Sequence, residues 1–116
     1  MKKSPQELIE KFIESVIKQA ECTEKGDYKS GNKYADEYIS AANDLLAGGD
    51  QYIDEFTKIL KHTNRDVRCI AAAFLLKDRT KQAVKTLRKL KWGIDIAAMG
   101  ARQTLKRYKK GILEIK

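Results

Sequence analysis

The sequence predicts a single all-α domain of about six helices. The chain has 116 residues, the usual size of one domain, so we assign residues 1–116 to one unit of fold. One Pro and seven Gly are too few turn formers for a protein with many short strands. Apolar residues make up 42% of the chain and recur at intervals of three and four, the period of one helical face. These observations predict three stacked antiparallel helix hairpins.

Local end signals mark the first two helices. Residues 4–7 combine an N-cap serine, a proline at the first helical position and a glutamate at the third, which is a capping box. This helix should end near Gly26, where glycine can adopt the left-handed conformation. Asp27 can cap the second helix, which should end at Gly48 and Gly49.

The remaining four helices are delimited in the same way. Asp50 is the predicted cap of the third helix, Asn64 of the fourth and Thr80 of the fifth. Trp92 and the glycine after it should end the fifth helix, and the sixth should run over about residues 94–110. Because the connections are only a few residues long, consecutive helices should pack as antiparallel hairpins.

The second helix of each hairpin repeats a core pattern at an interval of 30 residues. A shift of 30 aligns three alanines, and it aligns three leucines one turn further on: Ala41, Ala71, Ala101, Leu45, Leu75 and Leu105. Alanine lets helices approach closely and leucine fills the space one turn later, as stacked hairpins with a shared core require. The recurrence predicts a helical-repeat architecture.

The turn at residues 64–68 (NRDVR) resembles the inter-helix turn of HEAT-type repeats. It is followed, as in those repeats, by an Ala-Ala pair at 71–72 and a Leu-Leu pair at 75–76. Over about residues 7–113 the chain resembles a bacterial domain-of-unknown-function family of short HEAT-like proteins. This resemblance implies an all-helical solenoid fragment without established activity, and a role as a toxin-immunity protein for some members. In the turn, Asp66 and Arg68 are expected to tie adjacent hairpins together.

No catalytic, cofactor or metal site is expected. His62 is the single histidine and lies at a predicted helix end, so no catalytic triad can be assembled. Cys22 and Cys69 lie far apart and outside any ligand cluster, which predicts reduced structural thiols in a cytoplasmic protein. Charged residues interrupt any signal peptide, and no apolar stretch approaches the roughly 20 residues that span a bilayer, so no membrane partner is expected.

Charge is divided unequally along the chain. Residues 1–58 contain 8 basic and 12 acidic side chains, and residues 59–116 contain 16 basic and 4 acidic ones, which gives the net charge of +8. The leading hypothesis is a non-catalytic protein-binding module, such as an immunity protein that covers a bacterial toxin. Its acidic half would attract a basic partner, with Asp36, Glu37, Asp54 and Glu55 as candidate contacts.

The alternative hypothesis is nucleic-acid binding through the basic half. Two helical faces carry its cations, with Lys81, Lys85, Arg88 and Lys89 on one and Arg102, Lys106, Lys109 and Lys110 on the other. The candidate contacts are Lys85, Arg88, Arg102 and Lys106. Trp92 and Tyr108 are stacking candidates, although we expect them to pack at a hairpin junction and a helix end. The charge division also allows a homo-oligomer, with the acidic half of one copy on the basic half of another.

Overall fold

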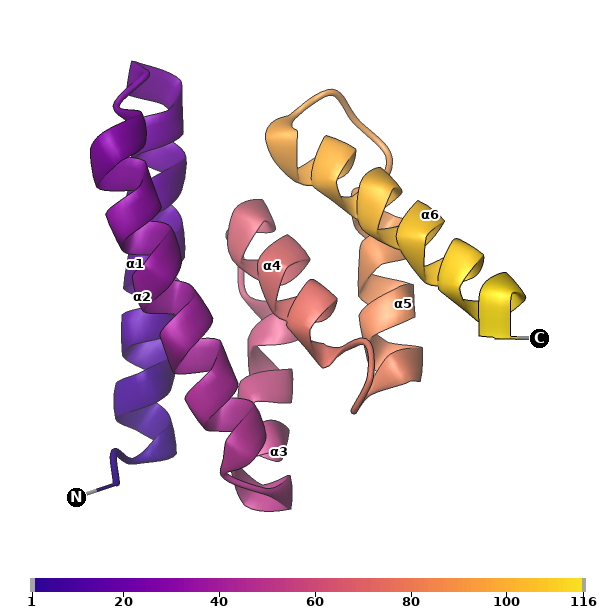
Figure 1. Cartoon of the computed structure of the whole chain (residues 1–116), viewed down its shortest axis with the longest axis horizontal. Helices are drawn as coiled ribbons and strands as arrows, with labels where there is room; N and C mark the ends of the chain where they lie inside the picture. Colours follow the sequence, from indigo (N-terminus) through magenta and orange to yellow (C-terminus); the bar gives the residue numbers. More distant parts are fainter. Residues whose placement is uncertain (1, 116) are drawn as a thin grey trace. The chain divides into compact units, whose positions relative to one another are not determined.

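The computed structural model describes residues 2–115, and the side chains of residues 2–111. Within these residues the chain forms six α-helices and one short 3-10 helix, without a strand, which confirms the all-α fold class (Figure 1). The elements are α1 (Pro5–Lys25), α2 (Tyr28–Ala47), α3 (Asp50–Lys58), η1 (Ile59–Lys61), α4 (Arg65–Leu75), α5 (Thr80–Leu90) and α6 (Ile96–Ile115).

The chain divides into two compact units, Met1–Ile59 and Leu60–Lys116, called unit 1 and unit 2 below. Unit 1 contains α1 to α3 and unit 2 contains α4 to α6. The boundary coincides with the change in charge, because Ile59 is uncharged and the acidic and basic halves are therefore the two units. It also lies inside the predicted middle hairpin, so the stacking of three hairpins in one domain stays a prediction.

Unit 1 begins and turns where the local signals indicate. The backbone N–H of Glu7 donates to the Ser4 side-chain oxygen at 3.2 Å, which caps α1. Gly26 ends α1 in the left-handed conformation with φ 74°, as expected for glycine after a helix. Asp27 then caps α2 by accepting from the N–H of Ser30 at 3.2 Å. These predicted ends are confirmed because capping depends on neighbours in sequence.

Aromatic rings join the three helices of unit 1. Phe12 of α1 is fully buried and meets Phe56 of α3 edge to face, with ring centroids 5.1 Å apart. Its ring also contacts Tyr38 of α2 at 6.0 Å in the same geometry. One side chain therefore contacts both other helices of the unit, and α1 and α2 run antiparallel beside each other (Figure 1).

Two predicted caps were wrong. Gly49, not Asp50, is the N-cap of α3, and its φ of 90° belongs to a backbone conformation that favours glycine. The short link between α2 and α3 requires this conformation, so Asp50 becomes the first helical residue. Thr80 likewise starts α5 instead of capping it, because its hydroxyl donates to the carbonyl of Leu76 at 2.7 Å.

In unit 2, polar side chains cap the starts of α4 and α6. Asn64 caps α4 as predicted, accepting from the N–H of Val67 at 3.0 Å. Asp95 accepts from the N–H of Ala98 at 2.9 Å, and α6 therefore begins at Ile96, two residues later than expected.

The positions related by the 30-residue shift recur as buried positions. Every member of the set is buried, from α2 through α4 to α6: Ala41, Ala71, Ala101, Leu45, Leu75 and Leu105. In unit 2 the small residues permit a close approach of α4 and α6, because a Cβ added at Gly100 would lie 3.3 Å from the sulfur of Cys69. The repeat thus places small residues where helices meet.

Candidate functional site

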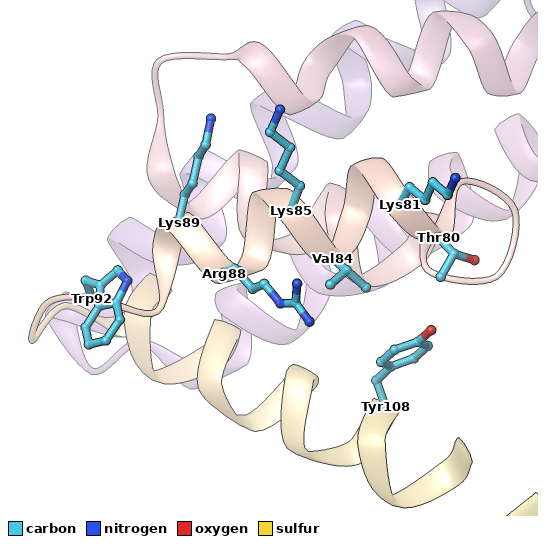
Figure 2. Close-up of a pocket in the computed structure, with 8 residues that line it drawn as sticks. All are labelled: Thr80, Lys81, Val84, Lys85, Arg88, Lys89, Trp92 and Tyr108. Atoms are coloured by element: carbon cyan, nitrogen blue, oxygen red, sulfur yellow. The ribbon is translucent and has the colours of Figure 1, made fainter. Parts of the chain in front are cut away.

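An open groove of about 640 Å³ lies between α5 and α6 of unit 2 (Figure 2). Seven lining residues belong to α5 or directly follow it, and one comes from α6: Thr80, Lys81, Val84, Lys85, Arg88, Lys89, Trp92 and Tyr108. Four of these eight side chains are cationic and none is acidic. The groove is therefore a positively charged surface with apolar and aromatic parts.

The cations of the groove occupy two sides of α5. Figure 2 shows the three lysines projecting from one side of α5, away from α6: Lys81, Lys85 and Lys89. Successive lysines are four residues apart, so their backbones are separated by about 6 Å along the helix axis. Arg88 projects from the other side, towards α6, where Tyr108 points back towards α5. Positive charge thus borders the groove along the length of α5.

Aromatic rings lie at the two ends of this groove (Figure 2). Trp92 is 74% exposed, and the Nζ of Lys91 lies 4.9 Å from the centroid of its indole ring. The expectation that this ring plugs a hairpin junction was wrong, because the loop after α5 holds it in solvent. Tyr108 is half-buried within α6, which continues seven residues further, so it does not lie at the helix end.

Arg65, at the start of α4, holds the loop between α5 and α6. Its Nε donates to Oδ2 of Asp95 at 2.6 Å, and its Nη2 donates to the carbonyls of Leu90 and Trp92 at 3.0 and 3.4 Å. The hydrogen bond with Arg65 is the main cause that lowers the pKa of Asp95, and the N–H of Ala98 adds to it. Arg65 thus ties the start of α4 to this loop, and sequence reasoning missed it. The available signal was its separation from Asp95 by 30 residues, the interval of the internal repeat. The tie expected from Asp66 and Arg68 stays a prediction.

Arg102 of α6 also holds this loop. Its Nη1 donates to the carbonyl oxygens of Lys91 at 2.7 Å and Gly93 at 3.0 Å. Its guanidinium is thereby directed to the loop, and Arg102 does not line the groove. Of the four cations predicted to contact nucleic acid, the groove contains Lys85 and Arg88. Lys106 is exposed on α6 and does not line the groove.

The four acidic candidates lie on unit 1. Asp36 and Glu37 belong to α2, and Asp54 and Glu55 belong to α3. Glu37 accepts from the hydroxyl of Ser15 at 3.3 Å, and Glu55 pairs with Lys58 at 2.9 Å on its own helix. Asp36 and Asp54 are exposed. The carboxylates are thus two pairs on two different helices, and one member of each pair is bonded within unit 1.

The two thiols are unbonded to each other, and the single histidine makes a hydrogen bond within a turn. Cys22 and Cys69 are free thiols, and burial raises the pKa of the Cys69 thiol to about 11, so it is protonated at neutral pH. His62 accepts from the N–H of Asn64 through Nδ1 at 3.0 Å, in the turn before α4. In the part of the chain that the structure describes, no three His, Cys, Asp or Glu side chains cluster as metal ligands.

Among residues 2–115, none of the helices is both long and apolar enough to cross a membrane.

No family model matches the chain, and no curated protein does. Among solved structures, the chain is similar to the protein RPA1889 from Rhodopseudomonas palustris CGA009, with a TM-score of 0.84 and 19% sequence identity over 93% of this chain and 90% of that one. At this identity the likeness concerns the fold. The comparisons therefore support the all-α fold, and membership of the HEAT-like family stays a prediction.

Proposed function

We propose that the chain is a non-catalytic module that binds single-stranded nucleic acid along the groove between α5 and α6. The observation that carries this proposal is the composition of the groove, in which four cations and two aromatic rings line one surface. A positively charged groove with aromatic platforms is the usual arrangement for binding single strands without sequence preference.

The lysines of α5 supply the phosphate contacts. Lys81, Lys85 and Lys89 are separated by successive helical turns, so their ammonium groups can follow a strand laid along the helix (Figure 2). Residues 79–111 include a single acidic residue, Asp95, whose charge is paired with Arg65. The charge of this stretch is therefore strongly positive, and it would steer a polyanion towards the groove.

The aromatic rings supply base contacts. Trp92 is 74% exposed, and bonds from Arg65 of α4 and Arg102 of α6 to the backbone carbonyls of Trp92 and Gly93 hold the loop that carries it. Lys91 lies over one face of the indole ring, so a base would stack on the other. Stacking of a base on such a ring contributes about 1–3 kcal/mol. Bases of a duplex are already stacked on one another, whereas those of a single strand can turn towards Trp92 and Tyr108. The groove therefore favours single strands.

Fluorescence anisotropy with a labelled oligonucleotide of about 12 nucleotides tests this proposal, since that length is in the range of single-strand binding sites. Binding should weaken with salt, with a slope of about −0.7 per phosphate neutralised. The variant Lys85→Gln with Arg88→Gln should bind more weakly, with a slope reduced by about 1.4. The matched control is Lys29→Gln with Lys33→Gln, which removes two exposed lysines from α2 of unit 1. Equal losses in both double variants would contradict a site in the groove.

Protein binding through unit 1 is the second candidate. Tyr28 and Ile39 are both exposed on α2, and their separation of eleven residues places them on nearly the same face of the helix. Asp36 lies between them and adds charge to this face. A basic partner would be recognised there, and the family resemblance makes a co-encoded toxin the protein to try. Isothermal titration should show loss of binding when Asp36, Glu37, Asp54 and Glu55 are changed to Lys, and unchanged affinity would contradict this surface.

A further inference from the structure

The loop after α5 and the first turn of α6 expose an unusual concentration of apolar surface. Trp92 is 74% exposed, Ile94 98%, Ile96 58% and Met99 51%. Among the residues whose exposure the structure describes, six large apolar side chains are exposed, and these four lie within eight positions. Single exposed apolar residues are ordinary, but a contiguous apolar patch marks an interaction surface. We call these four residues the apolar loop.

From this surface we infer that the apolar loop docks the protein onto the surface of an anionic lipid bilayer. The proposal does not rest on the nucleic-acid groove, because Trp92 is the one member of the apolar loop that lines that groove, and Ile94, Ile96 and Met99 do not. Aliphatic side chains have no stacking role with bases, so the groove does not explain their exposure. A bilayer offers both an apolar interior for these side chains and a charged surface around them.

The apolar loop is held out from the protein by specific bonds. Arg65 bonds to the carbonyls of Leu90 and Trp92, and Arg102 bonds to those of Lys91 and Gly93. These bonds fix the loop backbone, so little conformational freedom remains to be lost on docking. The backbone that carries Trp92 and leads to Ile94 is therefore held in place before docking.

Charge selects the kind of surface that the apolar loop can meet. Lys91 directly precedes Trp92, and Arg88 and Lys89 lie within four residues before it. The single carboxylate within the loop, Asp95, is paired with Arg65 at 2.6 Å. Anionic headgroups attract such flanking cations, while tryptophan is favoured at the level of the headgroups. The combination fits an anionic bilayer better than a neutral one.

The expectation that the chain has no membrane partner rested on the length needed to span a bilayer. A peripheral contact has no such requirement, because it needs only apolar side chains that reach the acyl boundary and cations that stay among the headgroups. The spanning argument and the docking proposal therefore concern different modes of membrane contact.

Trp92 makes the test direct, because it is the single tryptophan of the chain and lies in the apolar loop. The full chain is mixed with vesicles of phosphatidylcholine alone, or with about 30% phosphatidylglycerol to supply the anionic surface. We expect a blue shift of tryptophan emission and co-sedimentation with the anionic vesicles, and both should weaken with salt. Neither effect with anionic vesicles would overturn the proposal.

Matched variants separate the apolar loop from other causes. Ile94→Ser with Ile96→Ser should lower vesicle partitioning at least about tenfold, given the contribution of each buried methylene. Ile39→Ser, which removes an exposed isoleucine from α2, should leave it unchanged. The double variant should keep its oligonucleotide affinity, so failure of this proposal is distinguishable from failure of the groove. Vesicle binding unaffected by the double variant would overturn the assignment, as would sedimentation showing that the loop instead joins two copies of the chain.

Discussion

Arg65 and Asp95 form an ion pair at 2.6 Å between the start of α4 and the start of α6. They are separated by 30 residues, the same interval that relates the buried alanines and leucines of the internal repeat. The pair therefore links equivalent places in two successive repeats. Because Asp95 also caps α6, one carboxylate holds both the helix start and the loop.

Substitution of Asp95 separates these two contributions. Asp95→Ala removes the cap and the ion pair, and we expect it to lower the free energy of unfolding by about 1–2 kcal/mol. Asp95→Asn retains a good capping side chain and loses only the charge, so it should cost well under about 1 kcal/mol, as exposed ion pairs do. Urea unfolding measures both values. Equal costs for the two variants would show that the charge matters more than the cap.

The same pair gives a prediction for acid conditions. The bond from Arg65 lowers the pKa of Asp95 in the folded state, so its stabilising effect is present above the ordinary pKa of about 3.9. It is lost as the pH falls through the lowered folded value. The stability difference between the wild type and Asp95→Asn should therefore shrink below about pH 4 and stay constant near neutrality. Thermal unfolding at a series of pH values checks this, and a difference that grows on acidification would contradict it.

Larger side chains at the repeated alanine positions of the core should destabilise the protein. Ala71→Leu and Ala101→Leu should each destabilise the protein by about 1–3 kcal/mol, because both alanines are fully buried. Ala73→Leu is the matched control, since Ala73 is exposed on the same helix as Ala71. It should change stability by less than about 0.5 kcal/mol. If the buried and exposed variants unfold at the same urea concentration, the packing of α4 in unit 2 is wrong.

The two thiols should differ in reactivity. Burial raises the pKa of Cys69 to about 11, so a thiol reagent at pH 8 should modify it only after unfolding, whereas the half-buried Cys22 should react in the folded protein. Cys22→Ser provides the control, because it should remove the fast phase alone. A fast reaction in that variant would contradict the burial of Cys69.

Cys69 also predicts a loss of stability in alkali. The unfolded thiol ionises near its ordinary pKa of 9.0, and the folded one near 11. Stability is therefore unaffected below about pH 9 and falls as the pH rises towards 11, because only the unfolded state releases this proton readily. Cys69→Ala should unfold with less pH dependence over this interval, measured by circular dichroism. An identical pH dependence in both proteins would exclude this thiol as the cause.

The helices and several of their ends could be predicted because their signals are local. Ser4, Asp27 and Asn64 cap the helices that follow them, and each needs only a partner three residues away. The predicted cap at Asp50 was wrong because Gly49, with its positive φ, is the N-cap of α3. The 30-residue pattern also predicted buried positions correctly, because the spacing of apolar residues along a helix determines which of its residues face the core.

The candidate site was predicted only where its residues lie on a single helix. Helical spacing alone predicted Lys81, Lys85, Arg88 and Lys89 on one face of α5, and all four line the groove. The three lysines do share one side, but the Arg88 side chain turns to the other side, towards α6 (Figure 2). The role of Arg102 and the exposure of Trp92 depend on hydrogen bonds to a loop formed by other segments. Composition and periodicity do not specify such contacts, because they arise only when helices have packed.

The even spacing of Lys81, Lys85 and Lys89 along α5 has a kinetic consequence for the proposed ligand. Three chemically identical charges at equal steps present nearly the same attraction to a strand that has moved by one step. The energy of the complex would then vary little along the groove, and the barrier to lateral movement would be low. The protein would diffuse along a single strand in one dimension instead of dwelling at one register.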